Sequence, residues 1–243
     1  MDLLKHLMAE KEAHRKGGLY HQTQILFAYN SNRIEGSRLT QEQTRFIYET
    51  NTFLPDGDTP IHTDDVIETI NHFQAFDYML DIAGQPLSEE NIKEMHRILK
   101  RGTSDERDPR FRVGEYKAFP NMIGETVYTS APGEVAGKMR ELLSCYRSKN
   151  AVTERDVIDF HYHFEKIHPF QDGNGRVGRL ILFKECLAHG LVPILIDNEH
   201  KLFYYRGLRE YPQEPGYLVD TCLSAQDKYR ALIQYFLQPP LEP

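Results

Sequence analysis

A histidine, an acid, an asparagine between two glycines and two arginines are crowded into IHPFQDGNGRVGR, the thirteen residues from Ile167 to Arg179. Pro169 disfavours helical backbone in the residue before it, so a preceding helix is expected to end near His168. An apolar helical pattern resumes after the glycines and stops at Gly190. The stretch is therefore predicted to form a helix, a loop and a second helix.

The start of the second helix is suited to binding an anion. Free N–H groups and the positive end of the helix dipole are exposed there, and Gly173 and Gly175 let an anion approach the backbone closely. Arg176 and Arg179 are three residues apart, so both guanidinium groups are expected on one helical face, where they could bind phosphoryl oxygens. The pattern predicts a polyphosphate site.

Two further residues of this stretch could do chemistry. Asp172 stands beside the predicted phosphates, where a carboxylate commonly helps to hold Mg²⁺, and this role is compatible with capping the helix. His168 could accept a proton from an attacking hydroxyl group at neutral pH. A lone histidine is more often structural, but this one is followed at once by an anion site, an acid and arginines.

Two rival interpretations are weaker. His161, Glu165 and His168 have the spacing of one helical face, which would suit zinc, but the HExxH spacing is missing and Pro169 bends the chain at the last ligand. A P-loop is disfavoured because the glycines are not followed by GK[ST].

The residues HPFQDGNGRVGR resemble the HxFx[DE]GNGRxxR signature of the Fic-domain family. The resemblance implies a compact helical fold with a β-hairpin flap. It also implies transfer of AMP from ATP to a Tyr, Thr or Ser hydroxyl group of a target protein, with Mg²⁺ or Mn²⁺ as cofactor and diphosphate as leaving group. It makes His168 the general base and Asp172 the metal ligand. The implied phosphate contacts are Gly173, Asn174, Gly175, Arg176 and Arg179.

The resemblance also implies residues outside the signature. Tyr204 and Tyr205 match the adenine pocket, although an asparagine that some relatives use is not found near Tyr211 and Pro212. The segment at about 112–130 matches the flap, which pairs with the backbone of the target. Its docking residues would be Tyr116, Lys117, Asn121, Ile123 and Gly124. Phe170 is expected to pack into the core and anchor the loop.

A second motif, SNRIEG, runs from Ser31 to Gly36. Glu35 falls in the last turn of a predicted helix, where the dipole disfavours a negative charge by up to about 1 kcal/mol. A surface glutamate tolerates this, but the motif also resembles the [ST]xxxE[GN] inhibitory motif of Fic proteins, whose glutamate pairs with the second signature arginine. The resemblance implies that Ser31, Glu35 and Gly36 form an inhibitory segment, in which Glu35 holds Arg179 and ATP is presented wrongly for attack.

Other functions stay open. Some relatives use the same glutamate and histidine to remove AMP from a modified protein, with Glu35 positioning water. A nucleotide-binding interaction module with dormant chemistry is a further alternative. Transfer of phosphate, phosphocholine or UMP is less favoured because Arg179 is intact.

The periodicity predicts a mainly α fold. Helices are expected near 22–35, 63–82, 88–100, 132–147, 153–167, 174–189, 201–210 and 217–236, and Thr40 with Gln43 suggests a capping box that opens one more. The β-favouring residues of 112–130 predict a hairpin. We expect residues 1–243 to form one Fic unit, with an N-terminal helical segment at 1–60 that carries motif 31–36. The core would span 61–243, with signature 168–179.

Composition limits the partners. The net charge of −7 and pI near 5.9 argue against a broad nucleic-acid surface. The sequence shows neither a signal-peptide core nor a run of about 20 apolar residues, so neither export nor a membrane span is expected. Cys145, Cys186 and Cys222 are expected to be reduced core residues, which favours the cytoplasm. The expected partners are ATP and a target protein, with the chain itself as one candidate target, and a homo-oligomer is left open.

Overall fold

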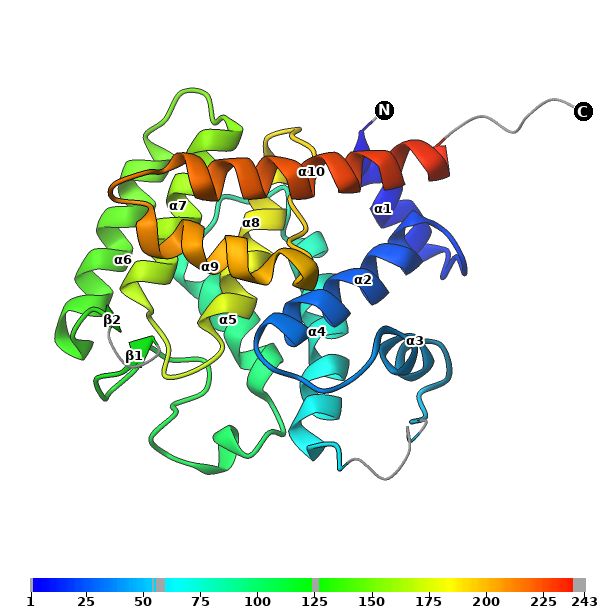
Figure 1. The fold of residues 1–243 in the computed structure, drawn as a ribbon, viewed down its shortest axis with the longest axis horizontal. Coiled ribbons are helices and arrows are strands. Elements are labelled where there is room, and N and C mark those ends of the chain that lie inside the picture. Colours follow the sequence, from blue (N-terminus) through cyan, green and yellow to red (C-terminus); the bar gives the residue numbers. More distant parts are fainter. Residues whose placement is uncertain (1, 54, 56–59, 124–126, 238–243) are drawn as a thin grey trace, which may run out of the picture.

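The computed structural model describes residues 2–53, 55, 60–123 and 127–237, and most of them are helical (Figure 1). Its α-helices are α1 (Leu3–Glu12), α2 (Leu19–Ile34), α3 (Gln41–Thr50), α4 (Thr63–Asp81), α5 (Glu89–Lys100), α6 (Pro132–Arg147), α7 (Glu154–Ile167), α8 (Asn174–Ala188), α9 (Lys201–Glu210) and α10 (Gly216–Leu237). Two 3₁₀ turns, Asp105–Arg107 and Asn198–His200, and two strands, β1 (Met122–Ile123) and β2 (Val127–Tyr128), complete the described elements. The predicted mainly α fold is confirmed.

Local signals set several helix boundaries. The Thr40 side chain accepts a hydrogen bond from the Gln43 backbone and Gln43 bonds back to Thr40, which confirms the capping box at the start of α3. Ahead of Pro169, His168 takes a left-handed conformation with φ 54° and ends α7. Gly36 has φ 105° and follows the end of α2.

Helix α8 lies at the centre of the fold. It is buried along most of its length and packs against α2, α4, α5 and α7. Its Phe183 contacts Phe27 of α2 and Phe76 of α4, with ring centroids 5.2 and 5.4 Å apart. Helices α9 and α10 pack against each other, and Figure 1 shows them side by side in orange and red. Because neighbouring helices cover α8 on several sides, the residues at its start are fixed by several neighbours.

The β structure of segment 112–130 is shorter than the predicted hairpin. Strands β1 and β2 pair antiparallel, with Met122 opposite Tyr128 and Ile123 opposite Val127. Residues 112–121 contain turns, bends and irregular backbone instead, and the positive φ angles of Arg112 and Gly114, 47° and 82°, interrupt an extended strand.

The prediction that all three cysteines lie in the core is wrong for one of them. Cys186 and Cys222 are buried, but Cys145 is exposed because it lies on the outer face of α6. All three are free thiols. Within the described residues, no helix combines the length and the apolar character that a membrane span needs.

Candidate functional site

His168 lies at the junction of α7 and the signature loop. Its backbone N–H donates to the Phe164 carbonyl at 3.0 Å, and its Nδ1 is buried without a hydrogen-bond partner in the described part of the chain. Burial, and then the positive charge of Lys117, lower the pKa of His168 to about 4. The imidazole is therefore neutral at pH 7 and able to accept a proton.

The loop is held by a side chain that belongs to the signature itself. Asn174 Oδ1 accepts from the Phe170 N–H at 2.8 Å, and Asn174 Nδ2 donates to the Phe170 carbonyl at 2.9 Å. The Phe170 ring is fully buried and stacks on His96, with centroids 3.9 Å apart. The expected anchoring role of Phe170 is confirmed. The Asn174 side chain also fixes the loop, and its contact with phosphate stays a prediction.

A carboxylate lies against the predicted anion site. Gly173, with φ 79°, is the N-cap of α8, and Gly175 is in its first turn. A Cβ atom placed on Gly175 would lie 2.3 Å from Oε1 of Glu35. Glu35 therefore occupies the space through which an anion would approach the start of α8.

Glu35 also pairs with Arg179, which lies 144 residues away in the sequence. Arg179 Nη2 donates to Glu35 Oε1 at 2.7 Å and to the Ser31 carbonyl at 2.9 Å, and Arg179 Nε donates to Ser31 Oγ at 3.0 Å. The Arg179 side chain is 1% exposed and that of Glu35 is 31% exposed. The predicted pair is present, with Gly36 directly after it, whereas the inhibitory role of the segment stays a prediction.

The other signature arginine is held by different acids. Arg176 is buried, donates to Asp172 Oδ2 at 3.0 Å and contacts Glu68. Lys100 donates to the same Oδ2 at 2.7 Å. Burial alone would raise the pKa of Asp172, but Arg176 and Lys100 hold it well below its usual value. Asp172 is therefore ionised. The two signature arginines have separate partners, since Arg176 contacts Asp172 and Glu68 whereas Arg179 contacts Glu35 and Ser31.

The residues around Asp172 suit a hard divalent cation. Glu68, Asp105 and Asp172 offer carboxylate oxygens within 4.8 Å of one another. Lys100 and Arg176 both use Oδ2 of Asp172, which leaves Oδ1, and the side chain is 47% exposed. Oxygen ligands of this kind are those that Mg²⁺ and Mn²⁺ prefer.

The zinc interpretation of α7 is not supported. His161 Nδ1 lies 3.1 Å from the Gly178 carbonyl, and its Nε2 lies 2.7 Å from the Tyr204 hydroxyl, so both ring nitrogens are engaged. Burial raises the pKa of Glu165 to about 8, and a protonated carboxyl is a poor metal ligand.

The two tyrosines predicted for the adenine pocket have different surroundings. Tyr204 is 1% exposed, and its hydroxyl contacts His161. Tyr205 is 38% exposed and donates to the Ile34 carbonyl at 2.9 Å, which links α9 to the end of α2. Their contact with adenine stays a prediction.

The side chains of three predicted flap residues form hydrogen bonds within the chain itself. Tyr116 donates to Glu89 at 2.9 Å, and Lys117 donates to Asn121 Oδ1 at 2.7 Å. Asn121 Nδ2 donates to the Phe170 carbonyl at 2.9 Å. These contacts tie the flap to the signature loop. Of the remaining two, Ile123 pairs through its backbone in β1 and Gly124 lies outside the described residues, so docking of a target here stays a prediction.

Sequence reasoning missed the support that α5 gives to the loop. The His96 Nδ1 accepts from the Gly114 N–H at 2.9 Å, so Nε2 carries the proton and donates to the Asp172 carbonyl at 3.1 Å. Burial lowers the pKa of His96 to about 3, which agrees with a neutral ring. His96 and Lys100 are four residues apart and lie on one face of α5, but this spacing gives no sign that both hold Asp172.

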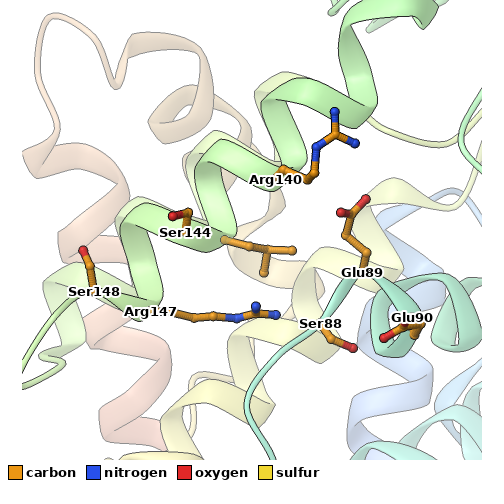
Figure 2. Close-up of a pocket in the computed structure, with 8 residues that line it drawn as sticks. Ser88, Glu89, Glu90, Arg140, Ser144, Arg147 and Ser148 are labelled. Atoms are coloured by element: carbon orange, nitrogen blue, oxygen red, sulfur yellow. The ribbon is translucent and has the colours of Figure 1, made fainter.

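Two hollows lie outside the signature. One, of about 450 Å³, lies between α5 and α6, and Figure 2 shows residues of both helices lining it: Ser88, Glu89, Glu90, Arg140, Ser144, Arg147 and Ser148. The other, of about 660 Å³, lies between α6 and α7 and includes Ile167, next to His168, and Ser130 at the end of the flap. The second hollow borders the candidate site.

Comparison with known proteins gives consistent matches. A model of the Fic/DOC family matches residues 86–185. Protein adenylyltransferase fic-1 of Caenorhabditis elegans is 28% identical over 77% of this chain and 36% of its own length. Protein adenylyltransferase Fic of Aedes aegypti is 28% identical over 82% of this chain and 38% of its own length. The chain thus spans less than two fifths of these relatives.

Solved structures are similar over nearly the whole chain. A Fic domain containing signaling protein from Bacteroides thetaiotaomicron has a TM-score of 0.72 and 25% identity, over 96% of this chain and 90% of that one. Fic-1 from C. elegans has a TM-score of 0.72 and 21% identity, over 96% and 72% of the two chains, a likeness of fold alone.

Proposed function

The chain belongs to the Fic/DOC family through its domain at residues 86–185, and on that premise we propose that it is a protein adenylyltransferase that rests in an inhibited state. It transfers AMP from ATP to a hydroxyl group of a target protein. The observation that carries the proposal is the carboxylate of Glu35, which lies at the start of α8 and pairs with Arg179 in place of a phosphate. The names of the curated relatives support the reaction class.

The reaction is an in-line displacement at the α phosphorus. The target oxygen bonds to this phosphorus, its proton passes to the neutral imidazole of His168, and the bond to the diphosphate oxygen breaks. The backbone N–H groups at the start of α8 hold the phosphates in line for attack. Nη1 of Arg179 and Nε of Arg176 are buried and have no partner among the described residues, so each guanidinium keeps a donor for a phosphoryl oxygen.

Asp172 would hold the divalent cation, Mg²⁺ or Mn²⁺, that accompanies ATP. When bound, the ion neutralises the negative charge on the leaving diphosphate. The chain contributes the position of the carboxylate, which Lys100 and Arg176 fix through Oδ2.

The Glu35–Arg179 pair explains the inhibited state. The terminal phosphate of ATP would need the same space beside Gly175 and the same guanidinium group that Glu35 uses. Like charges repel, so the nucleotide binds with its α phosphate out of line while Glu35 is in place. Glu35→Gly is expected to remove this competition.

Labelled ATP tests the reaction class. We expect Glu35→Gly to transfer label to protein from ATP labelled at the α phosphate and not from ATP labelled at the γ phosphate. Glu35→Gly/His168→Ala is the matched control and should transfer neither. Transfer of the γ label would show phosphorylation instead, and ATP binding without any transfer would support a dormant binding module.

The same carboxylate favours a second candidate function, removal of AMP from a modified protein. Glu35 is 31% exposed beside the predicted phosphate site, so it could accept a proton from water and direct that water at the phosphorus. Release of AMP from a modified target by the wild type, and not by Glu35→Gly, would support this candidate over transfer.

A further inference from the structure

Lys100, the last residue of α5, places its ammonium group among three carboxylates. Its Nζ lies 2.6 Å from Glu68, 2.5 Å from Asp105 and 2.7 Å from Asp172, and its side chain is 3% exposed. These acids offer oxygens within 4.8 Å of one another, as the oxygen ligands of a divalent ion do. The ammonium group therefore stands where such an ion would bind.

A second fixed cation completes the cluster. Arg176 contacts Glu68 and Asp172, so three negative and two positive groups leave a net charge of −1. Carboxylates in a partly buried cluster need such compensation. A divalent ion entering the cluster would meet two cations that are already in place, and it would have to displace Lys100 to reach all three acids.

Helix α5 also fixes the direction of Asp172. His96 holds the Asp172 carbonyl at 3.1 Å, and the Lys100 stem lies under the loop, with its Cδ 3.5 Å from the position of a Cβ on Gly173. Lys100 and Arg176 both bind Oδ2. Oδ1 is therefore the oxygen that remains for a metal.

We propose that Lys100 is a positioning residue that serves as a resident cation. It prevents the three carboxylates from binding a divalent ion by themselves and leaves Oδ1 of Asp172 to take a metal together with the phosphates of a nucleotide. The nucleotide part rests on the proposed function, whereas the exclusion of metal from the nucleotide-free protein does not. Free protein therefore binds divalent ions weakly, and ATP brings the metal with it.

Titration with Mn²⁺, with the free ion measured by its electron paramagnetic resonance signal, tests this without nucleotide or target. Lys100→Met keeps most of the stem and removes the charge. We expect this variant to bind one Mn²⁺ about 10- to 100-fold more tightly than the wild type, the scale on which outer groups change metal affinity. Adding Asp105→Asn should reverse the gain. The wild type should bind Mn²⁺ tightly only when a non-hydrolysable ATP analogue is present.

Lys93→Met is the matched control, because Lys93 lies on the same helix and pairs with Glu115 at 2.7 Å away from the cluster. Its Mn²⁺ affinity should equal that of the wild type. A folded Lys100→Met with wild-type affinity, or an equal gain in Lys93→Met, would overturn the proposal. So would wild-type protein that binds Mn²⁺ as tightly without nucleotide as with it, a test that needs no variant. AMP transfer is not the readout, so loss of the proposed activity would leave the result on Lys100 standing.

Discussion

Replacing Glu35 with glycine is predicted to lower the stability of the protein while raising its rate of AMP transfer. The Arg179 side chain is 1% exposed and loses its 2.7 Å partner, but it keeps both contacts with Ser31. Breaking a fully buried ion pair costs about 3–5 kcal/mol. Because Glu35 is 31% exposed and Arg179 keeps two acceptors, the value for one charge-assisted hydrogen bond, about 1.5–3 kcal/mol, applies instead.

This energy sets the expected fall in melting temperature and the expected rise in the rate of AMP transfer. At about 2–4 °C per kcal/mol for a chain of this size, the melting temperature should fall by roughly 3–12 °C. ATP must displace the same contact before Arg179 can bind its terminal phosphate. The rate of AMP transfer should therefore rise about 10- to 100-fold, since about 1.4 kcal/mol corresponds to a factor of ten.

The assay is label transfer from ATP labelled at the α phosphate, measured beside a thermal melt of each variant. Glu12→Gly is the matched control, because Glu12 is an exposed glutamate at the end of α1. It should change neither rate nor label pattern. A Glu35→Gly protein that melts lower but transfers AMP at the wild-type rate would show that release of Arg179 does not limit the reaction.

Three further predictions follow from the site. Burial, and then the positive charge of Lys117, lower the pKa of His168 to about 4. Lys117→Met removes that charge, so in the Glu35→Gly background the acidic limb of the pH–rate profile should move upward, part of the way toward the ordinary histidine value. Burial raises the pKa of Glu165 from its ordinary value of 4.5 to about 8 in the folded state. Between these two pH values the folded protein holds a proton that the unfolded chain has lost. The stability of the wild type is therefore full below pH 4.5 and falls as the pH rises toward 8. Melts from pH 5 to 9 should therefore show Glu165→Gln gaining on the wild type as pH rises. Asn174→Ala leaves the Phe170 N–H without a partner and the Phe170 carbonyl with Asn121 alone, and should cost about 1–3 kcal/mol of unfolding free energy, together with most of the activity.

Each of these has a contradicting result. An acidic limb that stays in place in Lys117→Met would mean that this charge does not act on His168. A constant difference in stability between Glu165→Gln and wild type would mean that Glu165 is ionised in the fold. Wild-type stability in Asn174→Ala, measured by urea unfolding, would mean that the loop is held without this side chain.

Local chemistry predicts much of this fold from sequence alone. The capping box at Thr40 and the stop at Pro169 act over a few residues, so they set the start of α3 and the end of α7 whatever packs around them. The outer face of α6 could not be predicted in the same way. Cys145 follows the helical pattern of its neighbours, and only packing decides which side of α6 meets the core.

The same difference between local signals and long-range packing applies to the residues of the site. The signature loop is local, so its histidine, acid and glycines can be recognised together. The pairing of Glu35 with Arg179 spans 144 residues, and only the resemblance to inhibitory motifs predicted it. Lys100 and Glu68 carry no motif at all. Their role depends on how α4 and α5 pack against the loop, and no spacing in the sequence encodes that packing.

We propose that this chain transfers AMP through His168 and that Glu35 inhibits the transfer. Intact-protein mass spectrometry after incubation of Glu35→Gly with ATP, Mg²⁺ and a cell lysate tests it most directly. We expect a mass increase of one AMP on the chain itself or on a lysate protein, and no such increase with Glu35→Gly/His168→Ala. Absence of any AMP adduct with a folded Glu35→Gly protein, or an equal adduct in the double variant, would contradict it.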